Sequence, residues 1–205
     1  MSRVIFDIET VGVDFDTLDE ERQAYLLRNA ETEAEEEAVK EQLGLSPLTG
    51  EIVAIGMLNP DTERGVVLFQ APEKEIGEFD EGGITFKTGS EKEILQEFWE
   101  TINRYNQFVT FNGRGFDCPF IMIRSAINRI KPTRDLMPNR YNGPHIDLLD
   151  QLSFFGATRR YSLDMWCRSL GIKSSKEEGI TGLDVKELFT EGRYLDIARY
   201  CARDL

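Results

Sequence analysis

The sequence predicts an α/β protein with a mixed sheet and helices on its faces. Three strand-like segments come first, and helical and strand-like segments then alternate toward a helical C-terminal part. This order favours helices packed against one sheet. The 205 residues fit a single domain, 1–205, and a hydrophobic content of 40% is enough for a core.

The strands are predicted from short apolar runs. Runs rich in Val, Ile, Leu and Phe with few charges are typical of buried strands. Such runs occupy residues 3–8, 51–57, 65–69, 108–111 and 145–149.

The helices are predicted from caps and from apolar spacing. Ser90 and Glu93 form a capping-box pattern, which starts a helix with apolar residues up to Ile102. A second helix follows from Asp117 to Ile130. Three more helical patterns lie around residues 162–170, 183–189 and 194–204.

Residues 14–44 form an acidic segment rich in Glu, Ala, Leu and Gln, which favours helix. Its apolar stripe is thin, so we expect a helical insertion that is largely solvated. Residues 14–41 hold eleven acids and three bases, a net charge of −8. A more specific interpretation is that this segment forms a lid over the active site, but the sequence does not require it.

The net charge of −13 argues against a polyanionic partner, but residues 101–176 hold five acids and twelve bases, a net of +7. A nucleic acid would fit such a basic face. Three cysteines without a CxxC pair suit a reducing cytoplasm. The N-terminus has no signal-peptide pattern, and no apolar run reaches the ~18 residues of a membrane helix.

Acidic residues occur at three places where elements end. Asp7 and Glu9 lie two apart at the end of the first strand, so their side chains share one face. Asp117 follows a turn containing Gly113 and Gly115. Mg²⁺ and Mn²⁺ prefer carboxylate oxygens, but a solvated acidic pair and a helix N-cap are equally ordinary interpretations.

Tyr200 and Asp204 lie four apart in a helical segment and therefore share one face. A half-buried tyrosine beside a helix-end aspartate is the alternative without function. Each acidic feature is weak alone, and the combination is what favours a metal site.

Three motifs carry a resemblance to a known family. Residues 4–10 read VIFDIET, residues 111–120 read FNGRGFDCPF, and residues 200–204 read YCARD. In this order they resemble the three motifs of the DEDD superfamily of 3′–5′ exonucleases, in its tyrosine subclass. The second motif resembles the proofreading domains of B-family DNA polymerases, and the chain resembles the stand-alone predicted polymerase-B-like exonucleases. The histidine subclass needs a histidine near the last aspartate, whereas the only histidine is His145.

The resemblance implies an RNase H-like fold with a mixed five-stranded sheet, an antiparallel hairpin on one side and helices on both faces. It implies a two-metal-ion phosphodiester hydrolase using Mg²⁺ or Mn²⁺. Asp7, Glu9 and Asp204 would hold one ion, and Asp7 with Asp117 the other. Tyr200 would orient the attacking water.

The resemblance also implies a substrate, a nucleic acid degraded from its 3′ end, with single-stranded DNA favoured over RNA. Asn112, Arg114 and Phe116 would then contact the 3′-terminal nucleotide. A solvated loop position is an equally good interpretation for Arg114. An RNA exonuclease, a phosphoesterase of nucleotides and a catalytically silent nucleic-acid-binding module of the same fold are the alternatives.

Other residues receive a function or a structural role. Cations for the nucleic-acid backbone are Arg159, Arg160, Lys173 and Lys176, and aromatic residues able to stack on bases are Phe154, Phe155, Tyr161 and Trp166. Because aromatic residues at this spacing usually pack inside, we expect most of them in the core. His145 is interpreted as structural, and Asp147 as an auxiliary acid only secondarily.

Two features depart from the family pattern. The acidic segment 14–44 is long, and the sequence stops at Leu205, one residue after Asp204. The family's last helix is expected to continue there, which predicts a shortened C-terminal helix and places the activity of this polypeptide in question.

Overall fold

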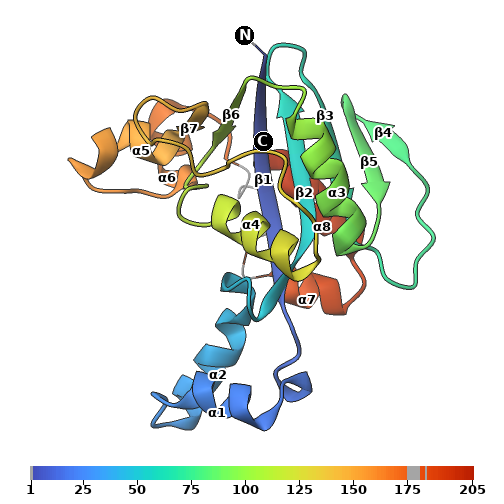
Figure 1. Ribbon diagram of the computed structural model, residues 1–205, viewed down its shortest axis with the longest axis vertical. Coiled ribbons are helices and arrows are strands. Elements are labelled where there is room, and N and C mark those ends of the chain that lie inside the picture. Colours follow the sequence, from blue (N-terminus) through green and yellow to red (C-terminus); the bar gives the residue numbers. More distant parts are fainter. Residues whose placement is uncertain (1, 175–180, 183) are drawn as a thin grey trace.

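The computed structural model describes residues 2–174, 181–182 and 184–205, and they form a mixed sheet flanked by helices (Figure 1). In the described part, seven strands are ordered β4-β5-β3-β2-β1-β6-β7. They are β1 (Arg3–Gly12), β2 (Gly50–Asn59), β3 (Arg64–Phe69), β4 (Phe79–Glu81), β5 (Ile84–Thr88), β6 (Gln107–Thr110) and β7 (His145–Asp147). The predicted α/β class is confirmed.

Five neighbouring strands, in the order β3-β2-β1-β6-β7, correspond to the predicted sheet. The strands β1, β2 and β3 are antiparallel neighbours, and β6 and β7 extend the sheet parallel to β1. The additional pair is the hairpin of β4 and β5, which joins the edge at β3. The expected number of five was therefore too low, because β4 is a three-residue strand with two acidic residues and no apolar run.

Helices cover both faces of the sheet, as expected. On one face α3 (Glu91–Ile102) and α4 (Asp117–Ile127) enclose a core containing Phe6, Phe98 and Phe108. On the other face α7 (Val185–Thr190) and α8 (Tyr194–Arg203) pack on Val53, Val67 and other residues. Figure 1 shows α3 and α4 in front of the sheet and α8 behind it.

Local signals set most helix ends. Ser90 accepts the Glu93 N–H while the Glu93 carboxylate accepts the Ser90 N–H, so the predicted capping box is confirmed. Helix α4 ends at Ile127, earlier than the expected Ile130, and Arg129 follows with a positive φ of 57°. That backbone conformation cannot continue a right-handed helix.

The acidic segment is helical and largely solvated, as predicted, although Leu18 and Leu43 are buried. It comprises η1 (Phe15–Thr17), α1 (Glu20–Leu27), α2 (Glu33–Glu41) and η2 (Gln42–Leu45). None of the residues of α1 and α2 is buried, and both helices project beyond the sheet at the bottom of Figure 1. The segment returns to β1 through η2, where a Cβ at Gly12 would lie 2.7 Å from the Leu43 Cβ.

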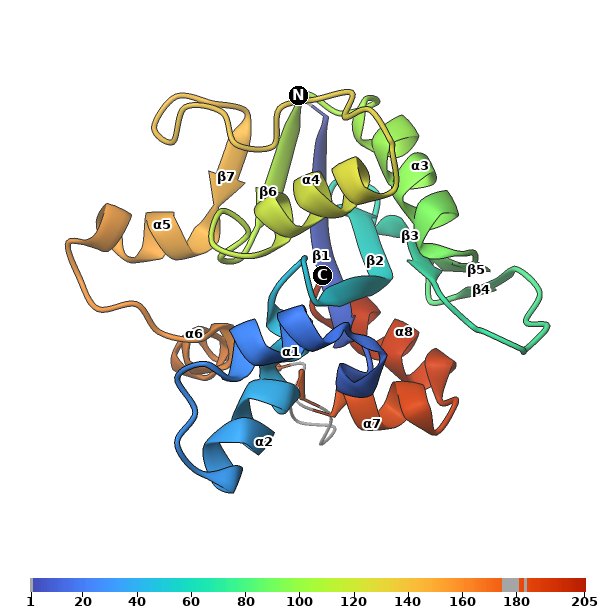
Figure 2. The ribbon, with the colours of Figure 1, turned by 60° about the horizontal axis from the view of Figure 1, so that its bottom comes forward.

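Three further elements connect β7 to the C-terminal part. They are α5 (Leu148–Leu152), η3 (Phe154–Gly156) and α6 (Leu163–Leu170), and a long connection separates α5 from α6 at the left of Figure 2. The predicted strand 145–149 is shorter, since Asp147 caps α5. Residue 183, the start of one predicted helix, lies outside the described residues. No helix in the described part of the chain has the length and apolarity to cross a membrane.

Candidate active site

The first strand presents two of the predicted acids on one face of the sheet. Val4, Phe6 and Ile8 point into the core under α3 and α4, so the alternating side chains of Asp7 and Glu9 face the side of α8. A register shift follows between Glu9 and Thr10. Such bulges redirect side chains and are common beside active sites.

Asp117 reaches the same place from the other side of β1. Strand β1 pairs with β6 only as far as Ile5 and Val109, and the Asp117 carboxylate accepts the Ile8 N–H at 3.2 Å. Asp117 is the first residue of α4, and the N-cap position is held by Phe116. The N-cap interpretation of Asp117 was therefore wrong, because Phe116 holds that position and the Asp117 carboxylate accepts the N–H of Ile8 on β1.

Helix α8 supplies the third group of predicted residues. Tyr200 is buried and lies beside Asp204, the residue that ends the helix. Close packing of α8 on the sheet depends on Gly56, which pairs with Asp7. A Cβ at Gly56 would lie 3.1 Å from the Cys201 Sγ.

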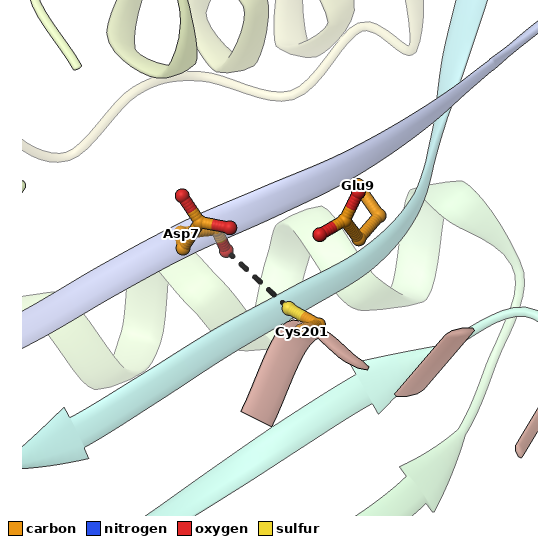
Figure 3. Close-up of side chains that lie close together, drawn as sticks. All are labelled: Asp7, Glu9 and Cys201. Carbon is orange, nitrogen blue, oxygen red and sulfur yellow. Dashed lines mark hydrogen bonds between the residues drawn. The ribbon is translucent and has the colours of Figure 1, made fainter. Parts of the chain in front are cut away.

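Asp7, Glu9 and Cys201 are brought close together (Figure 3), with one potential ligand atom of each within 4.8 Å of the others. The Cys201 thiol donates to the Asp7 carbonyl oxygen at 3.8 Å, drawn as the dashed line. Burial raises the pKa of Cys201 well above its ordinary value. Because a protonated thiol is a poor metal ligand, the ligands offered here are oxygen atoms.

Burial and mutual repulsion act on the carboxylates. Burial, followed by the charges of neighbouring acids, raises the pKa of Asp7 and of Glu9 well above their ordinary values. Burial raises the pKa of Asp117 to about 7. Among the neighbouring charges, that of Asp117 contributes most to the raised pKa of Asp7.

These residues fit divalent metal ions. Four acidic groups come from β1, α4 and the end of α8, and the charges of their neighbours add to burial in raising the pKa of Asp7 and of Glu9. A hard cation such as Mg²⁺ or Mn²⁺ takes carboxylate oxygens and would remove the repulsion.

A hollow of about 520 Å³ opens beside this group of acids. Asp7 and Asp204 line it, together with Asn112, which the sequence predicted as a substrate contact. Arg114 and Phe116 are not among its lining residues. The Arg114 guanidinium donates to the Pro138 carbonyl at 2.8 Å instead, and Phe116 packs against the core.

Asp147 is a positioning residue that the sequence did not reveal as such. Its carboxylate is buried and accepts the N–H groups of Asn112 at 2.9 Å, Arg114 at 2.9 Å and Leu149 at 3.0 Å. It thus holds the turn that leads into Asp117. An aspartate ending a strand before a helix is an N-cap signal, but the long-range bonds to residues 112 and 114 have no sequence signature.

His145 has the structural role that was expected. It is buried, and its Nε2 shares a hydrogen bond of 2.8 Å with the Thr110 hydroxyl on β6. Burial lowers its pKa to about 4. The imidazole is therefore neutral near pH 7 and links β7 to β6.

The aromatic residues of the connection differ from the expectation. Phe154 is 71% exposed and Tyr161 is 41% exposed, so the expected core position is wrong for both. Phe155 and Trp166 are half-buried. Arg159, Arg160 and Lys173 are exposed, whereas Lys176 lies outside the described residues.

Comparisons with known proteins agree with this arrangement. Residues 51–205 match the family described as predicted 3′–5′ exonucleases related to the exonuclease domain of PolB. No curated protein sequence matches the chain at a significant level.

A family B DNA polymerase from the archaeon Pyrobaculum calidifontis has a similar structure, with a TM-score of 0.60 and 16% sequence identity. The similarity covers 99% of this chain, which spans 23% of the polymerase chain. At this identity the similarity shows the fold, and the expected RNase H-like class is confirmed. The chain belongs to the family of predicted 3′–5′ exonucleases related to the exonuclease domain of PolB.

Proposed function

We propose that the protein hydrolyses phosphodiester bonds from the 3′ end of single-stranded DNA, using two divalent cations, Mg²⁺ or Mn²⁺. One observation carries the proposal: Asp7, Glu9, Asp117 and Asp204 come from three separate elements and interact as one group of acids, of which Glu9 and Asp117 are buried. Holding carboxylates that repel one another close together lowers the stability of the fold, and a role in metal-dependent hydrolysis explains why they are held there.

Asp7, Glu9, Asp117 and Asp204 would hold the cations. Bound there, the cations supply Lewis acidity for the phosphate and lower the pKa of a bound water. The Ile8 N–H fixes the orientation of Asp117 through its 3.2 Å hydrogen bond. The close packing of α8 over Gly56 fixes Asp204 relative to β1.

Tyr200 would orient the attacking water rather than take its proton. Burial, together with the charges of Glu9 and Asp204, raises the pKa of its phenol above the ordinary value near 10. The hydroxyl therefore keeps its proton at neutral pH. The protonated hydroxyl lies beside Glu9 and Asp204, where it would hydrogen-bond the attacking water.

The hollow beside Asp7 and Asp204 would hold the 3′-terminal nucleotide. A volume of about 520 Å³ is in the range of small-molecule sites. Asn112 lines it and would contact the substrate, and Arg114 and Phe116 would act from the turn behind it. The similarity to a DNA polymerase supports DNA as the polymer.

The test is degradation of 5′-labelled single-stranded DNA in Mg²⁺ or Mn²⁺. We expect a ladder shortened from the 3′ end with the wild-type protein and none with Asp7→Ala. Asp61→Ala is the matched control, because Asp61 is exposed and pairs with Arg3, at 3.3 Å. Activity on RNA alone would show that the substrate is RNA rather than DNA. Activity on mononucleotide esters alone would indicate a phosphoesterase, and inactivity on all of these would leave a silent binding module.

A further inference from the structure

Exposed aromatic rings gather where α5, η3 and α6 are joined. Phe154 is 71% exposed and Tyr141 is 67% exposed. Tyr141 packs against Phe155, with ring centroids 4.9 Å apart. Large aromatic side chains rarely gather on a surface without a ligand.

The backbone beneath these rings is held in a rare conformation. Phe154 and Phe155 both have positive φ angles, 50° and 56°, and Gly156 follows with 91°. Residues with a Cβ seldom adopt this region, and two consecutive phenylalanines there are unusual. This conformation leaves Phe154 in solvent while Phe155 turns against Tyr141.

Arginines flank the rings. The Arg140 guanidinium lies 6.0 Å from the Phe155 ring centroid, and the Arg159 guanidinium 5.3 Å from that of Tyr161. Arg140 and Arg160 both pair with Asp150, which is buried, so the three groups together keep a net positive charge.

The acids of this region do not offset that charge at the surface. Residues 136–174 contain five bases and three acids. Two of the acids, Asp147 and Asp150, are buried, and the third, Asp164, pairs with Arg168. The surface of this region is therefore basic in a protein of net charge −13.

We propose that Tyr141, Phe154 and Phe155, with Arg140, Arg159 and Arg160, form a stacking platform for single-stranded nucleic acid. The inference rests on the proposed exonuclease function and adds a second binding site upstream of the terminal nucleotide. Aromatic faces accept bases of any sequence, and arginines hold the phosphates.

The platform continues into the hollow at the acids. Tyr161 and Leu148 line that hollow, and five residues lie between Phe155 and Tyr161 in the chain. A segment of this length spans at most about 20 Å. A strand lying across the platform therefore reaches the hollow within a few nucleotides and delivers its 3′ end to Asp7 and Asp204.

Binding is tested in EDTA, where hydrolysis cannot occur, by the fluorescence anisotropy of a labelled oligothymidylate of about 15 nucleotides. We expect Phe154→Ala and Phe154→Leu to weaken binding about tenfold, the loss of one stacked base, and Phe154→Tyr to retain it. Tyr25→Ala is the matched control, because Tyr25 is 63% exposed on the acidic α1. An oligouridylate arm distinguishes RNA from DNA on the same platform.

The salt dependence of binding tests the arginines. Removal of one phosphate contact to a single strand lowers the slope of log K against log salt by about 0.7. We expect this change for Arg159→Ala and no change for Arg64→Ala, an exposed position on β3 at the other side of the sheet.

Kinetics separate this inference from the nuclease proposal. We expect Phe154→Ala to lower kcat/KM on the long oligonucleotide about tenfold and to hydrolyse a dinucleotide at the wild-type rate. Equal binding and equal kinetics for wild type, Phe154→Ala and Tyr25→Ala would overturn the platform while hydrolysis stands. Binding that depends on Phe154, without hydrolysis of any substrate, would support the platform and refute the nuclease.

Discussion

The hydrogen bonds of Asp147 allow a sharp prediction about the turn before Asp117. The two carboxylate oxygens divide three N–H donors between them: Oδ1 accepts from Asn112 and Leu149, and Oδ2 accepts from Arg114. An alanine at this position leaves all three donors without an acceptor. An asparagine retains one oxygen and can still satisfy the two donors that share Oδ1.

The two substitutions therefore differ in their expected cost. A buried donor without an acceptor costs roughly 1 to 3 kcal/mol, and the part-buried Asn112 and Arg114 belong to the lower half of that range because water reaches them. We expect Asp147→Ala to lower the free energy of unfolding by about 4 kcal/mol and Asp147→Asn by about 1 to 2 kcal/mol. Asp61→Asn, at an exposed ion pair, should change it by less than about 0.5 kcal/mol.

Urea unfolding in EDTA measures these free energies without a contribution from bound metal, and hydrolysis of labelled DNA provides the second measurement. If Asp147 only positions the turn, Asp147→Asn should retain part of the wild-type rate of hydrolysis. That remaining rate should be lost as the turn unfolds. If Asp147→Asn abolishes hydrolysis at full stability, Asp147 acts in the chemistry and the reasoning is refuted. Unchanged stability in both variants would refute it equally.

Three further predictions concern metal, protonation and the core. Mn²⁺ at ~100 times its dissociation constant should add ~2.7 kcal/mol to the free energy of unfolding and raise Tm by ~5 to 10 °C over EDTA in thermal melts. Asp7→Asn should abolish this rise and should itself have a higher Tm than the wild type in EDTA. His145, the only histidine, should give one imidazole NMR signal titrating near its pKa of about 4 in the fold and near ~6.5 in urea. The stability that neutral His145 confers is present above pH ~6.5 and is lost as pH falls toward 4, so a signal titrating near ~6.5 in the fold would contradict its burial. Glu91→Ala should cost ~3 to 5 kcal/mol in urea unfolding, because it leaves the part-buried Arg124 without the carboxylate bound at 2.6 and 2.7 Å, and a cost below ~1 kcal/mol would contradict that pairing.

Local signals in the sequence predicted the elements whose information is short-range. The capping box at Ser90 and the apolar run of β1 act within a few residues, and the structure has both. The hairpin of β4 and β5 escaped prediction, because short strands at an edge carry polar residues and depend on pairing with β3.

The candidate site divides in the same way. Alternation along one strand places Asp7 and Glu9 on one face, and helical spacing places Tyr200 and Asp204 on another, so each pair was predictable from its own segment. The hydrogen bond from Ile8 to Asp117 joins residues 109 positions apart, and no local pattern contains it. The same is true of Asp147, whose bonds to the turn cross 33 and 35 positions.

The sequence by itself determined the fold class, the motif residues and the basic character of residues 101–176. The tertiary structure decided which acids interact, which buried carboxylate holds the turn, and that Phe154 lies in solvent rather than in the core. The physical reason is that burial and pairing depend on what the rest of the chain places against a residue. Spacing along a segment defines only the face on which that residue lies.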